Sequence, residues 1–484
     1  MLVITALALL GVAGAVEAKT GAPLACRIAI SITLVGILLA GWVLVRSAGD
    51  PDMGTALVVM DPLARLLKLA VLALGLLAVL LPPASREITQ PGEYYALMLF
   101  ALTGLLLATG TNHLLFLFVA LELSSLSLYL LAGFSRTARA AEASLKYFLF
   151  GGVSAAFLLF GLSLIYGFAH TATLQGVAAA FAAGPPPALA MTGLVMVLVS
   201  IGFKLAAAPF HYWAPDVYQG SPATSVALVA GASKVVGLAV LARVLMIGFH
   251  SVSGSASWGG IVAGWSPWLA VLAAVSMVFG NVLALAQTSV RRLLAYSAVA
   301  NTGYILVAMS ANGGSAVSAA LFYVIVYALA TLGALAVTAS VEREQGTDSP
   351  ASFAGLARRS PWLAAALLVF LTSLAGVPPV AGFVGKFALF SSALANSSTD
   401  GAPGLTWLVA LAVVMSAVSL YYYLAVLKQA FVRDGGGSGP GPAIPPAHLL
   451  AIALPAAALV VLGFFPQLLM DPIASAVIDS LGDR

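Results

Sequence analysis

Apolar stretches that are long enough to cross a lipid bilayer recur along the whole chain. A transmembrane helix needs about 20 consecutive, mostly apolar residues. Inside lipid, each such stretch must satisfy its own backbone hydrogen bonds, so it folds as a helix. The predicted spans cover residues 2–16, 27–46, 57–82, 95–110, 113–134, 145–168, 189–209, 222–249, 266–286, 293–312, 315–341, 361–396, 405–430 and 447–467. We therefore expect an all-α, polytopic membrane protein of about fourteen transmembrane helices, with residues 1–484 forming one integral membrane domain.

Composition excludes several other classes of protein. Of 484 residues, 61% are hydrophobic and 8% are charged, whereas soluble domains carry roughly 25% charged residues. The net charge of +4 comes from basic residues scattered through short loops, which does not form the basic stripe of a nucleic-acid-binding protein. Cys26 is the single cysteine, so the chain has no intrachain disulfide and no multi-cysteine metal or iron–sulfur site of its own.

Basic residues alternate between the predicted loops. Every second loop carries them: Lys19, Arg86, Arg136 with Arg139 and Lys146, Arg291 with Arg292, Arg343 with Arg358 and Arg359, and Lys428 with Arg433. Lys and Arg collect on the cytoplasmic side of membrane proteins. With an even number of spans, this phase predicts that both termini lie on the periplasmic side of a bacterial plasma (inner) membrane.

The first segment has a competing interpretation as a cleaved signal peptide. Leu2–Val16 is short for a span and is followed by Glu17 and Ala18. A signal peptide normally begins with a basic region, which is missing here. Cleavage would also invert every later span and place the Arg-rich loops outside, against the charge rule. We interpret the segment as a span.

Four ionisable residues fall in the middle of predicted spans: Glu122, Lys204, Lys234 and Lys386. A charge at the bilayer centre costs roughly 2.5–3.5 kcal/mol. Each residue could be a structural ion-pair member that fixes helix packing, but one acid cannot neutralise three lysines. Because burial disfavours the charged amine, such lysines can load and release protons.

Two spans are interrupted close to their lysines. Pro209 lies five residues after Lys204, and Pro378 and Pro379 precede Lys386. Proline removes a backbone donor and disrupts a helix, and broken helices at matching places in two halves mark ion pathways in transporters. The two breaks suggest two five-helix repeats, residues 95–249 and 266–430, each with a broken fourth helix; an odd number of helices makes the second copy inverted.

Two further polar features adjoin these spans. Ser125 and Tyr129 follow Glu122 at i+3 and i+7, which puts polar groups along one helical face. This face is a hydrated stripe or a close helix–helix interface, and the two are compatible. His211 follows the first break and is either a proton relay or a histidine at an interface. The histidines have no metal-ligand spacing, so we predict no metal site.

Five motifs resemble a known family. They are Leu121–Leu126 (LELSSL), Ala143–Leu149 (ASLKYFL), Phe203–His211 (FKLAAAPFH), Trp213–Pro222 (WAPDVYQGSP) and Gln287–Ser297 (QTSVRRLLAYS). Together they resemble the antiporter-like membrane subunits of respiratory complex I, the proton-pumping NADH:quinone oxidoreductase. The resemblance covers residues from about 57 to 430, and the Pro-Asp-Val-Tyr-Gln-Gly string is typical of the N type.

This resemblance implies a function and a set of partners. It implies a proton half-channel around Glu122 and Lys204, a central Lys234 and an exit-side Lys386. It also implies that FMN, iron–sulfur clusters and quinone lie in partner subunits with no cofactor in this chain, and that the partners are other antiporter-like and small membrane subunits. The alternatives are a Mrp-type cation/proton antiporter, in which a glutamate usually stands where Lys386 is, and a passive scaffold, which leaves the buried charges unexplained.

Overall fold

The secondary structure is helical throughout the described part of the chain. The computed structural model describes residues 1–20, 22–46, 57–81, 88–397, 404–434 and 444–482. Within these ranges there is no strand, and two isolated bridges, His113 with Thr173 and Ser255 with Val262, join loop residues. Twelve helices of the described residues are long and apolar enough to cross a membrane. The prediction of an all-α polytopic membrane protein is confirmed; Arg86 and the side chain of Lys19 lie outside the described residues.

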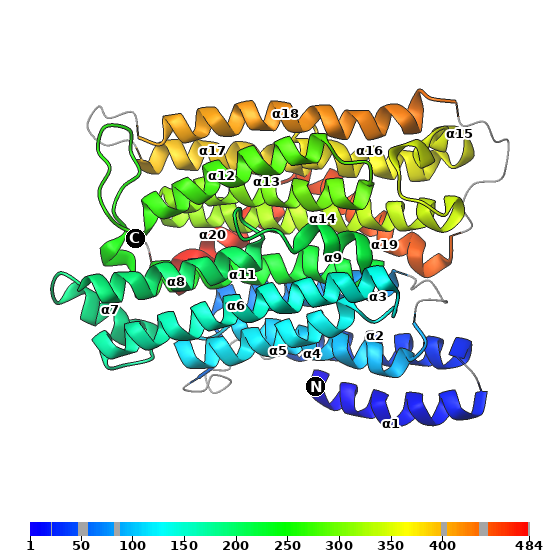
Figure 1. Cartoon of the computed structure of the whole chain (residues 1–484), viewed down its shortest axis with the longest axis horizontal. Helices are drawn as coiled ribbons and strands as arrows, with labels where there is room; N and C mark the ends of the chain where they lie inside the picture. Colours follow the sequence, from blue (N-terminus) through cyan, green and yellow to red (C-terminus); the bar gives the residue numbers. More distant parts are fainter. Residues whose placement is uncertain (21, 47–56, 82–87, 398–403, 435–443, 483–484) are drawn as a thin grey trace. The chain divides into compact units, whose positions relative to one another are not determined.

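The chain divides into two compact units, and the first comprises Met1–Ile201 and Gly220–Ser251. Its helices run side by side along a common direction (Figure 1). They are α1 (Leu2–Thr20), α2 (Ala22–Arg46), α3 (Pro62–Leu80), α4 (Pro91–Thr109), α5 (Leu114–Ala132), α6 (Ala138–Ala169), α7 (Leu174–Ala182), most of α8 (Ala188–Leu205), α10 (Ala223–Ala227) and α11 (Ser233–Arg243). Two π-helical segments, Leu228–Ala232 and Val244–Gly248, flank α11 and complete one buried span.

The second unit comprises Gly202–Gln219 and Val252–Arg484. Its helices are α9 (Ala214–Gly220), α12 (Trp265–Leu285), α13 (Val290–Ser310), α14 (Gly314–Gln345), α15 (Leu356–Arg359), α16 (Pro361–Ala375), α17 (Ala381–Ser397), α18 (Thr406–Phe431), α19 (Pro446–Phe464) and α20 (Gln467–Leu481). Helices α13 and α14 form the core of this unit, since nearly all their residues are buried.

Helix α1 is an integral part of the first unit. It packs along α2 and α4, and Leu2, Ala6 and Leu9 are buried. The helix extends to Thr20, four residues beyond the predicted end of the span, so it reaches the length of a full membrane crossing.

The last span is longer than the sequence predicted. The prediction ended it at residue 467, but the chain breaks at Phe465 and Pro466 and continues as α20. His448 Nε2 in α19 lies 3.2 Å from Ala336 O of α14, and a Cβ placed on Gly314 of α14 would lie 3.9 Å from Val477 in α20. Helices α19 and α20 therefore run antiparallel along the length of α14. Hydropathy missed α20 because only one of its faces is buried, and such a helix is apolar along one stripe only.

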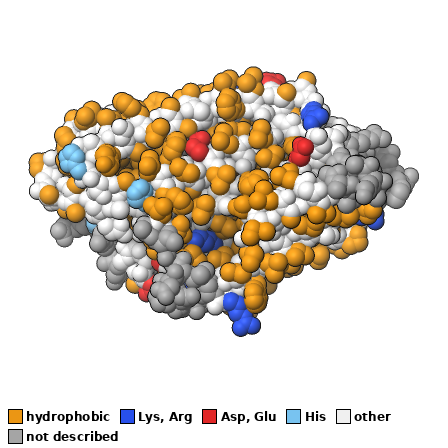
Figure 2. All heavy atoms as spheres, turned by 90° about the horizontal axis from the view of Figure 1, so that it is seen from below, with side chains coloured by type: hydrophobic (Ala, Val, Ile, Leu, Met, Phe, Trp, Pro, Cys, Tyr) orange, Lys and Arg blue, Asp and Glu red, His pale blue; other side chains and the backbone are white. Residues whose placement is uncertain are grey.

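The outer surface is apolar over wide areas. Figure 2 shows hydrophobic side chains over most of the face drawn, with few charged ones between them. On α5 and α6, large apolar residues are exposed at helical spacing: Leu115, Val119, Leu126, Leu130, Leu145, Leu149, Val153 and Phe160. Soluble monomers rarely expose contiguous patches of this kind, so this surface faces lipid.

Candidate functional site

Both predicted helix breaks are present, and they share a backbone pattern. Helix α8 ends at Leu205, Ala206 is left-handed (φ 57°), and the Ala208–Pro209 peptide bond is cis. Helix α16 ends at Ala375, Gly376 is left-handed (φ 81°), and the Pro378–Pro379 bond is cis. In each break the cis proline follows the left-handed residue by three positions.

Side chains satisfy the backbone groups that the two breaks release. At the first break, Ser276 Oγ accepts a hydrogen bond from Ala208 N (2.9 Å), and Thr302 Oγ1 donates one to Leu205 O (2.7 Å). At the second, Ser373 Oγ accepts one from Gly382 N (3.2 Å). Irregular backbone at membrane depth requires such partners, so these hydroxyls stabilise both breaks.

The buried amine of Lys386 lies at the second break. The residue is 4% exposed, and its Nζ donates to Ala375 O and to Ser416 Oγ, each at 2.9 Å. Nζ also lies 4.7 Å from the centroid of the Tyr304 ring. The amine thus binds the carbonyl end of α16, where the helix dipole favours a cation, and the face of an aromatic ring, which does the same.

A cavity opens beside this amine. It has a volume of about 270 Å³ and is lined by Lys386, Ser416, Gly376 and the rings of Phe383, Phe387 and Phe390. The exposed side chain of Phe387 lies at its rim. The amine of Lys386 therefore lies next to space that can hold small molecules such as water.

The other two lysines are also buried. Lys204 is 9% exposed and stands two residues before the left-handed Ala206 of the first break. Lys234 is 2% exposed and lies on α11 directly after a π-helical turn. Single π-helical turns are frequent at functional sites because they change the direction of the side chains that follow.

Glu122 lies on α5 with the polar face that the sequence predicted. Its side chain is half-buried, whereas Ser125 and Tyr129 are buried. The Tyr129 hydroxyl bonds to Ser125 and lies within electrostatic range of Glu122. It also packs against Gly151 of α6, where a Cβ would lie 1.9 Å from the hydroxyl oxygen. The face is both polar and closely packed.

The structure places the predicted residues in two groups. Glu122 and Lys234 belong to the first unit, and Lys204, His211 and Lys386 belong to the second. The predicted pairing of Glu122 with Lys204 stays a prediction. His211 is buried, with its ring stacked on Tyr212 at 4.7 Å between centroids and edge-on to Tyr296 at 6.1 Å; its role as a relay also stays a prediction.

Sequence reasoning missed a polar network in the core of the second unit. Asn281 Nδ2 donates to the Tyr304 hydroxyl (3.1 Å), and the Tyr422 hydroxyl donates to Asn281 Oδ1 (3.0 Å). Tyr304 is the residue whose ring lies under Lys386. The network is therefore connected to the second break. Asparagines inside otherwise apolar predicted spans were the available signal.

A neighbouring set of groups continues this network. The Tyr323 hydroxyl donates to Asn301 Oδ1 (2.5 Å), Asn301 Nδ2 donates to Ser297 O (2.8 Å), and Ser297 bonds to the Tyr423 hydroxyl. All these residues are buried on α13, α14 and α18. Buried polar groups of this number are expensive unless they are all hydrogen-bonded.

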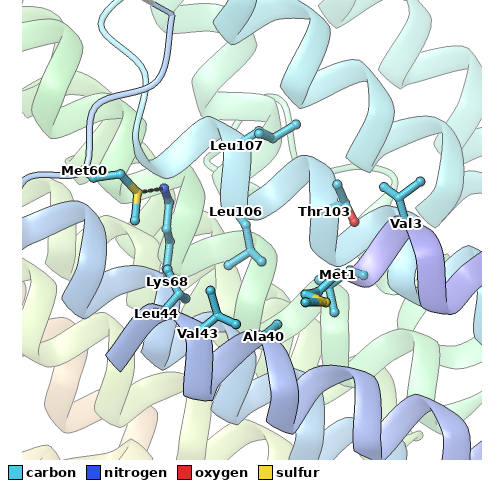
Figure 3. A pocket seen from close by; sticks show the side chains of 11 residues that line it. Met1, Val3, Ala40, Val43, Leu44, Met60, Lys68, Thr103, Leu106 and Leu107 are labelled. Atoms are coloured by element: carbon cyan, nitrogen blue, oxygen red, sulfur yellow. Dashed lines mark hydrogen bonds between the residues drawn. The ribbon is translucent and has the colours of Figure 1, made fainter. Parts of the chain in front are cut away.

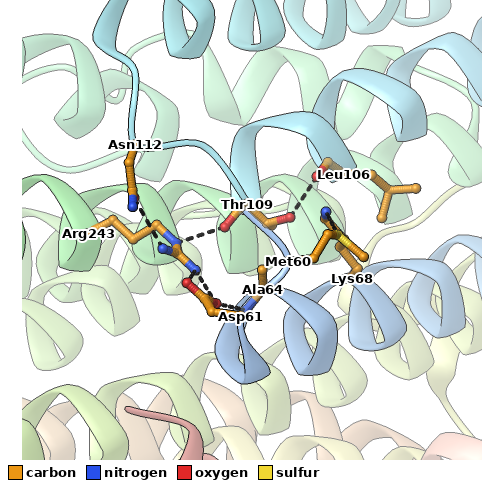
Figure 4. A network of polar contacts seen from close by, with 8 residues as sticks. All are labelled: Met60, Asp61, Ala64, Lys68, Leu106, Thr109, Asn112 and Arg243. Carbon is orange, nitrogen blue, oxygen red and sulfur yellow. Dashed lines mark hydrogen bonds and ion pairs between the residues drawn. The ribbon is translucent and has the colours of Figure 1, made fainter. Parts of the chain in front are cut away.

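A second group that the sequence did not reveal lies in the first unit (Figure 4). Asp61 caps α3 by accepting from Ala64 N (2.7 Å), and both its oxygens accept from Arg243 Nη2. Arg243 also donates to Thr109 O (2.9 Å) and Asn112 Oδ1 (3.3 Å). Arg243 is 1% exposed, so it is a further buried cation, and its counter-ion is Asp61.

The described residues offer no grouping of three or more His, Cys, Asp or Glu side chains that could hold a metal ion. Cys26 is a free thiol in α2.

Comparison with known proteins decides the family. The family model described as NADH:quinone oxidoreductase/Mrp antiporter, transmembrane, matches residues 111–418. The NADH-quinone oxidoreductase subunit N 2 of Acidobacterium capsulatum is 45% identical to the chain, over 92% of the chain and 90% of that protein. The chain belongs to the NADH:quinone oxidoreductase/Mrp antiporter family.

Solved structures of this family share the fold. A chain of respiratory complex I from Thermus thermophilus is 34% identical, with a TM-score of 0.78 over 97% of this chain and 99% of that one. A chain of the Mrp complex from Dietzia superposes with a TM-score of 0.81 at 21% identity, which shows a common fold alone. The NADH-quinone oxidoreductase subunit N proteins of Trichlorobacter lovleyi and Desulforamulus reducens are 36% and 35% identical to the chain, over 92% and 90% of it.

Proposed function

We propose that the chain is the antiporter-like subunit N of a proton-pumping NADH:quinone oxidoreductase, and that it moves protons across the membrane through its buried lysines. The observation that carries this proposal is the position of Lys204, Lys234 and Lys386, all at most 9% exposed in a lipid-facing helical protein. Buried amines of this kind are too costly to be kept for packing alone. The identity to subunit N proteins supplies the class of complex.

The pathway starts at Glu122 and Lys204. At contact distance and an effective dielectric constant near 20, their attraction is about 4 kcal/mol, which changes the proton occupancy of an amine about a thousandfold. Making and breaking this pair is the switch: Lys204 keeps its proton while Glu122 is close and releases it when the pair opens. The proton then passes to Lys234 and leaves through Lys386, with His211 as a relay.

The exit at Lys386 has the chemistry that a release site needs. Its Nζ is held by two neutral acceptors, Ala375 O and Ser416 Oγ, and by the ring of Tyr304. No carboxylate bonds to this amine in the described residues, so no ion pair has to break when the proton leaves. The adjoining cavity of about 270 Å³ gives water a route to it.

The two halves of the protein are inverted repeats, residues 95–249 and 266–430. The matching breaks support this: in each, the helix is followed by a left-handed residue that stands three positions before a proline. Inverted repeats with broken helices place an ion pathway near the middle of the bilayer.

Both termini lie on the periplasmic side of a bacterial plasma membrane. Arg136 donates to Gln90 Oε1 (2.6 Å), so the start of α4 and the Arg-rich loop before α6 share one end of the first unit. In the second unit, α19 starts beside the end of α14 that carries Arg343, and α20 ends beside the start of α14. The positive-inside rule puts the Arg-rich ends in the cytoplasm and the carboxyl terminus opposite.

The free energy for pumping comes from partner subunits. The described residues offer no group that could hold a metal ion, and in this proposal FMN, iron–sulfur clusters and the quinone site belong to other subunits of the complex. The direct neighbours are the other antiporter-like and small membrane subunits and the lipid bilayer. Quinone reduction in those partners opens and closes the Glu122–Lys204 pair.

The test uses the assembled complex that copurifies with the chain. Glu122→Gln and Lys204→Ala are expected to lower the number of protons pumped per electron transferred while the subunits still copurify. Glu142→Gln is the matched control, because Glu142 is 62% exposed and pairs with Lys146 on the surface of α6. Loss of assembly, with the remaining complexes pumping normally, would mean that the charges are structural.

The Mrp-type antiporter is the alternative within the same family, and the shared fold keeps it in consideration. It predicts that vesicles containing this protein alone exchange sodium for protons. Absence of exchange, together with copurification of quinone-reducing subunits, favours subunit N.

A further inference from the structure

An apolar pocket in the first unit has one charged residue on its wall (Figure 3). The pocket has a volume of about 270 Å³ and is lined by the start of α1, the last third of α2, the first turns of α3 and the last third of α4. Apart from Lys68 and Thr103, its lining residues are apolar: Met1, Leu2, Val3, Ala40, Val43, Leu44, Met60, Leu106 and Leu107. Met1 and Val3 at the rim are exposed, so the pocket opens to the surroundings of the protein.

Lys68 directs its amine toward one end of this pocket. The residue is 5% exposed, and its Nζ donates to Met60 Sδ at 2.8 Å, a weak acceptor. Nζ also lies against Gly110 at the end of α4, where a Cβ would be 2.9 Å away. Met60 precedes the first residue of α3 and Gly110 follows the last residue of α4, so the amine reaches back to the helix ends.

The charge of Lys68 is not balanced by the nearby acid. Asp61 and Arg243 are the charged groups that face it. Both oxygens of Asp61 bind Arg243 Nη2, at 2.6 and 2.7 Å, and one oxygen also accepts from Ala64 N. The described cluster of Lys68, Asp61 and Arg243 therefore has a net charge of +1 when both bases are protonated, and one further anion would neutralise it.

We propose that this pocket binds one anionic phospholipid, with the phosphate at Lys68 and an acyl chain along α1, α2 and α4. The position of the amine fits a headgroup, because the helix ends beside it are where a membrane span meets the interface. The apolar lining fits a hydrocarbon chain, and the exposed Met1 and Val3 at the start of α1 leave the pocket open on one side. A soluble anion would gain nothing from the apolar walls, so the lipid is the occupant that uses both parts of the site.

The pocket also fixes which leaflet supplies the lipid. Its lining residues come from the start of α1, the end of α2, the start of α3 and the end of α4. These ends share one side of the membrane, opposite the basic loop that precedes α6. With the orientation proposed above, the lipid comes from the periplasmic leaflet.

The experiment measures retained lipid on the full-length protein in the complex with which it copurifies. The complex is reconstituted in nanodiscs of equimolar phosphatidylglycerol and phosphatidylcholine, extracted again in mild detergent, and its lipids are counted by mass spectrometry. Wild type is expected to retain one more phosphatidylglycerol per complex than Lys68→Met, whereas Lys68→Arg retains it. Lys146→Met is the matched control, because Lys146 is exposed and paired with Glu142; it is expected to behave as wild type.

A second variant tests the acyl-chain part of the site without touching the charge. Ala40→Phe puts a ring into the pocket and is expected to release the same single phosphatidylglycerol. If Lys68→Met retains as much phosphatidylglycerol as wild type, the proposal is wrong. If Ala40→Phe retains it, the acyl chain does not lie in this pocket and the proposal is wrong. If washing with inorganic phosphate alone removes it from wild type, the site recognises an anion and the apolar walls contribute nothing, which also overturns the proposal. Lipid stoichiometry does not depend on pumping, so this test is independent of the proposed function.

Discussion

The guanidinium of Arg243 donates from Nη2 to both carboxylate oxygens of Asp61, at 2.6 and 2.7 Å. The two residues stand 182 positions apart in the chain, one at the start of α3 and the other at the end of α11. The same guanidinium donates to Thr109 O at the end of α4 and to Asn112 Oδ1 in the loop that follows it. One buried side chain therefore joins three spans of the first unit.

Removing the acid from this group is expected to destabilise the protein strongly. Asp61→Ala leaves Arg243, which is 1% exposed, without its counter-ion, and breaking a buried pair costs about 3–5 kcal/mol. We expect a clear drop in the midpoint of thermal unfolding of the purified protein. Glu142→Ala removes an exposed pair and should cost less than about 1 kcal/mol; equal losses in the two variants would contradict the role of Arg243 as a structural tie.

Lys386→Met is expected to lower proton pumping per electron transferred while the complex still assembles. Methionine keeps most of the length of the side chain but cannot carry a proton, and the bonds to Ala375 O and Ser416 Oγ are lost. The measurement is acidification by proteoliposomes, with Lys146→Met as the control for an exposed lysine. Unchanged pumping by Lys386→Met would remove this residue from the pathway.

Tyr304→Phe distinguishes the two contacts of this residue: the ring against Lys386 Nζ and the hydroxyl that bonds to Asn281. The ring stays at its contact with Nζ, but the hydroxyl that accepts from Asn281 is lost. Leaving Asn281 short of one partner should cost about 1–3 kcal/mol of stability, and pumping should slow if protons pass along this network. Tyr421→Phe is the control, since Tyr421 is 70% exposed. A normal pumping rate with reduced stability would make the network structural.

Gly463→Ala tests the contact between α19 and the second break. A Cβ at this position would lie 2.1 Å from Pro379 O. Because this oxygen belongs to the backbone, it cannot move aside as a flexible side chain would. We therefore expect the free energy of unfolding to fall by about 1–3 kcal/mol. Gly152→Ala on α6 is the control, because a Cβ there meets no atom within 4 Å; it should be neutral or stabilising by up to about 1 kcal/mol. Thermal unfolding of both variants provides the comparison, and equal stability would show that α19 does not pack closely on the break.

The sequence by itself determined the helical fold, the spans, the two breaks and the identity of the buried lysines. These are local properties. About 20 apolar residues make a span in any context, and a proline lacks the backbone donor wherever it stands. A lysine within an apolar stretch can likewise be identified from that stretch alone. The breaks at Pro209 and Pro379 were therefore predictable from short segments.

Only the tertiary structure decided the rest, because it depends on residues that are distant in the chain. Arg243 lies within the predicted span 222–249, and its partner Asp61 stands 182 positions away in the chain. Asn281 and Tyr304 belong to two different helices, α12 and α13, and only their packing brings the two side chains together. Helix α20 was missed because its burial comes from α14 and not from its own hydropathy. The contribution of a buried polar side chain to stability depends on the group with which it forms a hydrogen bond or ion pair. The sequence alone does not identify that group.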